Sequence, residues 1–216
     1  MDLIKIKDIY DSPNYNSQII VAGWVRAFRG NRFIELNDGS TIENIQCVIS
    51  DSNRKNEDYK KINVGSSVKI KGNLIESIGK GQSFEVEILN LEILGESDPE
   101  TYPIQPKKHS FEFLREQAHL RIRTSTFSAV MRIRSKLAYA VHKFFNEIGF
   151  NYIHTPIITS SDAEGAGEMF QVTTLNNSKI DKRELNYTED FFGKKTSLTV
   201  SGQLEAETYA LGLGNV

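Results

Sequence analysis

The stretch SQIIVAGWVRAF (residues 17–28) decides the fold, because it opens a series of short segments with the composition of β-strands. Four further segments follow it: RFIELND (32–38), NIQCVIS (44–50), SVKIKGNLIES (67–77) and FEVEILNLEIL (84–94). Each is rich in β-branched or aromatic residues, and the turn signal NDGS closes the second. The first hundred residues therefore predict an all-β domain of five strands.

A short helix is expected between the third and fourth strands. In NEDYKKINV (56–64), Tyr59, Ile62 and Val64 recur at a roughly helical spacing, and Gly65 follows as a stop. Three strands, a short helix and two strands is the chain order of a five-stranded OB barrel, whose sheet face binds oligonucleotides. The order alone leaves an SH3-like or another small barrel as the alternative. We expect residues 1–97 to form the OB domain.

Composition indicates a globular chain without a membrane span. Of the 216 residues, 39% are hydrophobic and 25% are charged, and no apolar run is long enough to cross a bilayer. The N-terminus MDLIKIKDIY lacks the pattern of a signal peptide. Cys47 is the one cysteine and lies in the apolar run IQCVI, so it is expected in the core. A single cysteine excludes an internal disulfide or a cysteine-based zinc site, and it fits a cytoplasmic location.

The charge is unevenly distributed. The net charge of −2 argues against a general nucleic-acid binder, yet residues 101–136 hold eight Lys and Arg against two acidic residues. This basic segment is either a solvated linker or a site for a polyanion. Three of the five prolines fall within residues 95–110, so we expect residues 98–123 to be a linker.

The segment after the linker predicts a long amphipathic helix. Within residues 124–149 the apolar residues form one stripe, Thr124 or Ser125 can cap the start, and Gly149 suits a left-handed stop. FNYIHTPII (150–158) is expected to be a strand, with Pro156 marking an edge, a bulge or an interface. Near the end, a strand to about residue 200 and a helix over 202–211 are predicted, with Ser201 as a plausible cap.

Several side chains of the barrel could contact RNA. Aromatic rings stack on unpaired bases, arginines hold phosphates, and a glutamine offers both a donor and an acceptor to a base edge. The candidates are Trp24, Arg26, Phe28, Arg29, Arg32, Phe33 and Gln46. The alternative is that the rings fill the core. We expect this of Trp24, whereas the residues alone leave Phe33 open.

The loop ITSSDAEGAGEMF (158–170) has three readings: a metal loop, a mobile lid over a substrate, or a solvated turn. The twelve-residue calcium pattern is absent, and the loop lies between a proline-ended strand and a further strand, which favours the lid. The four histidines show no ligand spacing such as HxxxH. The sequence has no Walker loop, no GxGxxG and no GxSxG elbow.

The motifs together resemble a known family. The long helix with GFNYIHTPII (149–158) is similar to motif 1 of class II aminoacyl-tRNA synthetases. With an OB barrel and a linker of this length, the chain resembles their aspartyl, asparaginyl and lysyl subclass. SSDAEGAGEMF (160–170) and LTVSGQLEAETYALGLGNV (198–216) are similar to bacterial-type asparaginyl-tRNA synthetases. The resemblance implies that residues 124–216 form the N-terminal part of an α+β catalytic domain, an antiparallel sheet with the motif 1 helix.

The resemblance also implies roles for individual residues. In the family an aromatic ring and a glutamine of the barrel read the central anticodon base. Phe33 and Gln46 match them, with Arg29 as a companion. For the amino acid, the mobile loop's glutamate matches Glu164 and holds the α-amino group, and Ser201 and Gln203 match the pocket motif. Aspartate-specific relatives carry a lysine where Ala206 stands, which fits a neutral asparagine substrate. Motif 1 builds the family's dimer interface, to which Phe150 and Pro156 would belong.

The implied activity is ATP-dependent ligation of asparagine to tRNA(Asn) through asparaginyl-adenylate, with Mg²⁺, in a homodimer. Motifs 2 and 3, which hold ATP in the family, would lie beyond Val216. We therefore expect a truncated, inert portion of the enzyme, with no catalytic residue and no metal ligand in these residues. The alternatives are a truncated paralogue that binds tRNA or dimerises without catalysis, and an aspartyl-type synthetase.

Overall fold

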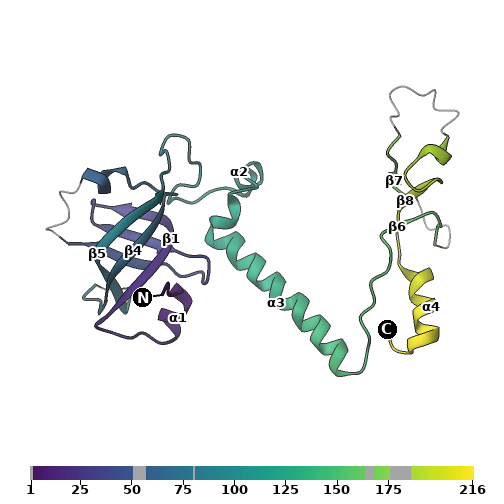
Figure 1. Cartoon of the computed structure of the whole chain (residues 1–216), viewed down its shortest axis with the longest axis horizontal. Helices are drawn as coiled ribbons and strands as arrows, with labels where there is room; N and C mark the ends of the chain where they lie inside the picture. Colours follow the sequence, from purple (N-terminus) through teal and green to yellow (C-terminus); the bar gives the residue numbers. More distant parts are fainter. Residues whose placement is uncertain (1, 51–56, 80, 164–167, 176–185) are drawn as a thin grey trace. The chain divides into compact units, whose positions relative to one another are not determined.

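The computed structural model describes residues 2–50, 57–79, 81–163, 168–175 and 186–216. The chain forms two compact units, Met1–Arg134 and Ser135–Val216. The first holds the barrel, and the second holds a small sheet together with helical segments (Figure 1).

The first unit is a closed five-stranded barrel (Figure 1). Its strands are β1 (Ser17–Arg29), β2 (Phe33–Asn37), β3 (Ile45–Ile49), β4 (Ser67–Glu76) and β5 (Phe84–Gly95). They close in the order β1-β2-β3-β5-β4, with β3 and β5 parallel and the other pairs antiparallel. The predicted OB barrel is confirmed, and each of the five strands lies within one or two residues of its expected range.

Strand alternation supplies the barrel core. On β2, Ile34 and Leu36 are fully buried, while Phe33 and Glu35, which alternate with them, point to the other side of the sheet. Cys47 is completely buried, as predicted, and burial raises the pKa of its thiol.

The short helix before β4 is a 3-10 turn, η1 (Glu57–Lys61), that adds Tyr59 to the core. An N-terminal helix not predicted from the sequence, α1 (Ile6–Asp11), packs Ile6 and Ile9 into the same core.

The segment between barrel and long helix is ordered and packs on the barrel. It contains α2 (Phe111–Glu116), capped by Ser110, whose Oγ accepts a 3.2 Å hydrogen bond from the Phe113 N–H, and the turn η2 (Arg121–Arg123). Ile104 and Leu114 are buried. At Gly65, whose φ is +92°, a Cβ would lie 2.8 Å from Tyr102 Cζ, so the barrel admits Tyr102 only because this residue is glycine.

The long helix α3 (Ser125–Glu147) is confirmed. Thr124 Oγ1 accepts a 3.4 Å hydrogen bond from the Phe127 N–H, and Gly149 has φ +86° after the last turn, as the sequence predicts for both ends. The strand predicted over residues 150–158 is wrong. Only β6 (Ile158–Thr159) is a strand there, because the extended segment before it makes isolated backbone hydrogen bonds and Pro156 has no N–H to donate.

The second unit contains a small antiparallel sheet. Its strands β6, β7 (Gln171–Val172) and β8 (Thr196–Leu198) lie in the order β6-β8-β7. The 3-10 turn η3 (Tyr187–Glu189) precedes β8, and α4 (Gln203–Leu213) follows it. The prediction that Ser201 caps α4 is wrong, because Gly202 occupies the N-cap position. Ser201 Oγ still accepts a 3.1 Å hydrogen bond from the Gln203 N–H.

Candidate functional site

The three barrel residues predicted to read RNA share the outer face of β1, β2 and β3. In the strand register Arg29 lies opposite Phe33, and Glu35, two residues further along β2, lies opposite Gln46. The intervening residue Ile34 is buried. The fold therefore brings Arg29, Phe33 and Gln46 onto one surface.

This outer face combines a ring with cationic groups. The Arg32 guanidinium lies 5.4 Å from the centroid of the half-buried Phe33 ring. Arg29 Nη2 forms an ion pair with Glu35 Oε1. An accessible ring beside guanidinium groups can stack a base and hold the neighbouring phosphate, which is how single-stranded RNA is bound by sheets of this kind.

Sequence reasoning missed Glu85 on β5. Its Oε2 accepts hydrogen bonds from Gln46 Nε2 at 3.0 Å, Ser77 Oγ at 3.2 Å and Gln82 Nε2 at 3.1 Å. The bond to Gln46 holds the glutamine amide in one orientation on the outer face. Alternation in FEVEILNLEIL does place Glu85 outward, but the parallel pairing of β3 with β5 that brings it to Gln46 has no local sequence signal.

Trp24 corrects another expectation. It was predicted to lie in the core, yet 39% of it is exposed on the outside of the barrel. Its ring is covered in part by the Arg123 guanidinium, whose centre lies 5.1 Å from the ring centroid. The Trp24 ring therefore lies on the barrel surface, where it packs against an arginine from the segment that follows the barrel.

The predicted amino-acid residues gather at the start of α4. Ser201, Gln203 and Ala206 lie within the first turn and the residues before it, and Gln203 and Ala206 are three residues apart on the same face of the helix. Gln203 Nε2 donates a 3.0 Å hydrogen bond to Glu207 Oε1, a partner that sequence reasoning did not single out although its i, i+4 spacing could have shown it. Glu164, the fourth predicted residue, lies outside the described residues.

The backbone before α4 is fixed by short-range contacts. The Ser201 N–H donates to Thr199 Oγ1 at 3.2 Å, and the Thr199 N–H donates to the Ile157 carbonyl at 2.8 Å. A Cβ at Gly202 would overlap Thr155. The small residue thus lets this turn lie directly on the extended segment after α3, which positions Ser201 and Gln203.

A second carboxylate was missed in the small sheet. Asp190 is almost fully buried, and its Oδ1 accepts hydrogen bonds from the Thr174 N–H at 2.9 Å, the Thr174 hydroxyl at 2.8 Å and the Phe191 N–H at 2.8 Å. Hydrogen bonds from Thr173, then from Thr174 and Phe191, hold the pKa of this carboxyl far below its usual range. Asp190 therefore ties the segment after β7 to the segment before β8.

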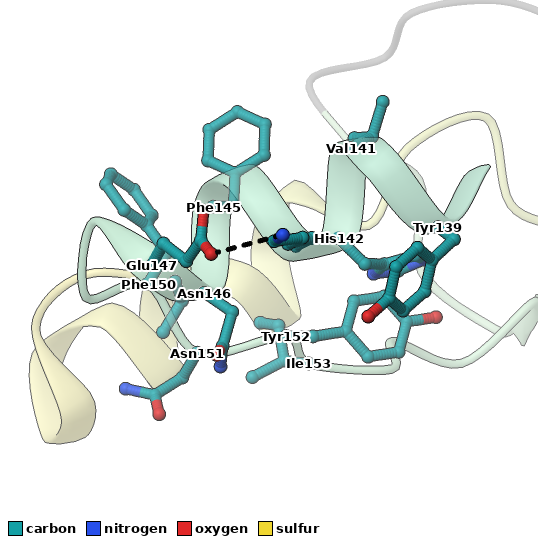
Figure 2. A pocket seen from close by; sticks show the side chains of 12 residues that line it. Tyr139, Val141, His142, Phe145, Asn146, Glu147, Phe150, Asn151, Tyr152 and Ile153 are labelled. Atoms are coloured by element: carbon teal, nitrogen blue, oxygen red, sulfur yellow. Dashed lines mark ion pairs between the residues drawn. The ribbon is translucent and has the colours of Figure 1, made fainter. Parts of the chain in front are cut away.

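An apolar groove lies along the second half of α3 (Figure 2). It has a volume of about 780 Å³, and its lining includes Tyr139, Phe145, Phe150 and Tyr152. The centroids of the His142 and Tyr152 rings lie 4.7 Å apart in an edge-to-face arrangement. Lys143 Nζ forms an ion pair with Glu147 Oε1 at 3.6 Å. Of the two predicted interface residues, Phe150 lines the groove, whereas Pro156 is exposed and does not.

Within the described ranges, no helix combines the length and the apolar composition that a membrane span requires. No group of three or more His, Cys, Asp and Glu side chains in that part of the chain is arranged to hold a metal ion.

Two family models match the chain in succession. Residues 19–94 match the OB-fold nucleic acid binding domain, and residues 110–212 match the class II tRNA synthetases of the D, K and N type. The first match covers the barrel strands, and the second runs from α2 through most of α4.

Among curated proteins, the asparagine–tRNA ligase of Cytophaga hutchinsonii is 55% identical over 224 aligned residues, covering 100% of this chain and 48% of the relative. That of Borreliella burgdorferi is 49% identical, covering 98% of this chain and 47% of the relative. The chain thus spans about half the length of the curated relatives it matches.

Solved structures agree at the level of the fold. The asparaginyl-tRNA synthetase of Pyrococcus horikoshii, in complex with asparaginyl-adenylate, superimposes with a TM-score of 0.76 at 22% identity, over 99% of this chain and 46% of that one. The Entamoeba histolytica enzyme gives 0.74 at 23% identity. The chain therefore belongs with the class II tRNA synthetases of the aspartyl, asparaginyl and lysyl subclass and corresponds to the N-terminal portion of an asparaginyl-tRNA synthetase.

Proposed function

We propose that the whole protein ligates asparagine to tRNA(Asn) at the expense of ATP. The observation that carries this proposal is the 55% identity to an asparagine–tRNA ligase over the full length of this chain. In the first step a carboxylate oxygen of asparagine attacks the α-phosphorus of ATP and pyrophosphate leaves. In the second, the terminal ribose hydroxyl of the tRNA attacks the asparaginyl carbonyl carbon and AMP leaves. No covalent bond to a protein side chain is needed.

The residues around the start of α4 would bind and orient the amino acid. Ser201 and Gln203 supply neutral hydrogen-bonding groups, and Glu164 would take the α-ammonium group. Ala206 places a methyl group three residues after Gln203, on the same helical face. A pocket without a cation there leaves an aspartate carboxylate unpaired, while an uncharged carboxamide suffers no such penalty. This supports asparagine over aspartate.

The outer face of the barrel would recognise the anticodon. The ring of Phe33 is accessible for stacking, Gln46 is held by Glu85, and Arg29 stands opposite Phe33 in the register. An unpaired anticodon nucleotide could stack its base on the ring of one strand while a polar side chain of the neighbouring strand contacts the edge of that base.

ATP and Mg²⁺ belong to the proposed reaction as substrate and counter-ion. Mg²⁺ neutralises phosphate oxygens and eases the departure of pyrophosphate. No residue of this chain is assigned to either. The part played by these residues is to hold asparagine so that its carboxylate is presented to the nucleotide.

Dimerisation through the motif 1 region is the remaining part of the proposal. The apolar side chains of the second half of α3 are exposed, among them Leu137 at 60% and Phe144 at 57%, and Phe150 lines the neighbouring groove. An apolar face of this extent is typical of an interaction surface, and we propose a second copy as its partner.

Charging of tRNA tests the proposed function. The whole protein, incubated with ATP, Mg²⁺ and tRNA(Asn), should attach radiolabelled asparagine to the tRNA and leave aspartate free. Efficient attachment of aspartate would instead identify an aspartyl-type synthetase, and absence of both products would contradict the ligase assignment.

A further inference from the structure

Arg123 packs against two aromatic rings, those of Trp24 and Tyr102. Its guanidinium centre is 5.1 Å from the centroid of the Trp24 ring and 5.9 Å from that of Tyr102. Its Nη1 donates a 3.3 Å hydrogen bond to the Tyr102 hydroxyl. Stacking fixes the plane of a guanidinium while leaving N–H groups at its edge for another partner. Arg123 is thus held in place without being neutralised.

A second arginine, Arg26, lies beside the same two aromatic residues, Trp24 and Tyr102. It lies where the pairing of β1 with β2 slips between Val25 and Ala27, an irregularity of the kind that re-aims a side chain. Arg26 is half-buried and lines a small cavity of about 40 Å³ together with Trp24 and Tyr102. The two arginines come from a barrel strand and from the segment after the barrel, and both lie beside Trp24 and Tyr102.

Neither guanidinium forms an ion pair with an acidic side chain in the part of the chain that the structure describes, whereas Arg29 pairs with Glu35 and Arg115 with Glu112. Burial, followed by repulsion from Arg123, lowers the pKa of Arg26, while Tyr102 and Glu35 act in the opposite direction. Two partly buried like charges are costly unless an anion joins them.

We propose that Arg26 and Arg123 together bind one phosphate group of the RNA backbone, next to the face that carries Phe33. The proposal rests on the proposed function, which makes tRNA the ligand of the barrel. In the strand register Ala27, beside Arg26, lies opposite Glu35, two residues from Phe33, so the phosphate would flank the nucleotides bound on that face. Two planar forks converging on one anion match the geometry of a phosphate. The basic segment 101–136, left open by the sequence as linker or polyanion site, then contributes one defined contact.

The test is the salt dependence of tRNA binding by the protein. The dissociation constant for a tRNA(Asn) transcript is measured between 50 and 200 mM salt for the wild type and for Arg26→Gln, Arg123→Gln and the double variant. Loss of one phosphate contact should make the slope of log Kd against log salt shallower by about 1. Because both arginines hold the same phosphate, the double variant should lose little more than either single one. Arg115→Gln, which removes an exposed arginine already paired with Glu112, should leave the slope unchanged.

Further variants distinguish a contact between Arg123 and a phosphate from a role of Arg123 in packing alone. Arg123→Lys keeps the charge and should retain most of the slope, whereas Arg123→Gln should not. If Arg123→Gln fails to fold by circular dichroism, Arg26→Gln decides, because Arg26 makes no ion pair within the described residues. Folded variants with the wild-type slope overturn the phosphate site while leaving the proposed function intact. A wild type that does not bind the transcript overturns the proposed function itself.

Discussion

Gln203 Nε2 donates a 3.0 Å hydrogen bond to Glu207 Oε1 one turn further along α4. This bond holds the amide of a residue that we propose binds asparagine. In Glu207→Ala the amide would rotate more freely, and losing one hydrogen bond to a charged acceptor costs about 1.5–3 kcal/mol at most. We expect the KM for asparagine to rise by roughly tenfold, with a smaller change in kcat.

A matched control distinguishes orientation from charge. Glu205→Ala removes an acid from the first turn of the same helix but no bond to Gln203. Steady-state kinetics with varied asparagine should show a nearly unchanged KM for this variant. Equal effects of the two substitutions would mean that Glu207 acts through its charge alone.

Ala206→Lys should turn the pocket towards aspartate. A lysine there would present a cation three residues after Gln203, where a substrate carboxylate could pair with it. The ratio of kcat/KM for asparagine to that for aspartate should fall by at least about tenfold. Thr208→Lys adds the same charge to an exposed position of α4 two residues from Ala206, on another face of the helix, and should leave the ratio as it is.

Phe33→Ala should weaken tRNA binding without affecting activation of the amino acid. Stacking of a base on an aromatic ring contributes about 1–3 kcal/mol, so the Kd for tRNA(Asn) should rise from about fivefold to about a hundredfold. Pyrophosphate exchange, which needs no tRNA, should be unchanged. Phe33→Tyr keeps the ring and should bind nearly as the wild type. An unaltered Kd for Phe33→Ala would remove this residue from the anticodon site.

Asp190 should give the second unit a stability that depends on pH. The folded state depresses the pKa of this carboxyl, so its contribution is complete above the pKa of about 3.9 of an unfolded aspartate and is lost as the pH falls below it. In thermal unfolding, Asp190→Asn should therefore have a lower Tm than the wild type at pH 7, and the difference should shrink progressively as the pH falls below about 4 towards the depressed pKa of the folded state. Glu189→Gln, an exposed neighbour, should show no such convergence. A Tm difference independent of pH would mean that the carboxylate charge is not what stabilises this sheet.

The barrel could be predicted because its signals are local. Alternation on β2 separates Ile34 and Leu36 from Phe33 and Glu35, and the chain order of strands and short helix restricts the topology. The two ends of α3 were equally readable, since Thr124 and Gly149 act on the backbone within one turn. Such features depend on nearest neighbours in the chain.

What escaped prediction depends on partners distant in the sequence. Trp24 is of a residue type expected in the core, yet Arg123, almost a hundred positions later in the chain, covers its ring on the outside of the barrel. Glu85 meets Gln46 through a parallel strand pair, which no turn signal announces. Residues 150–156 have the composition of a strand, yet composition cannot supply the neighbouring backbone that a strand needs.

Amino-acid-dependent exchange of pyrophosphate into ATP tests the central claim most directly, because it reports formation of the adenylate without tRNA. The whole protein should catalyse exchange with asparagine and at least about a hundredfold less with aspartate, as expected of a pocket that leaves the wrong substrate's charge unpaired. Equal exchange with both amino acids, or a preference for aspartate, would contradict the account.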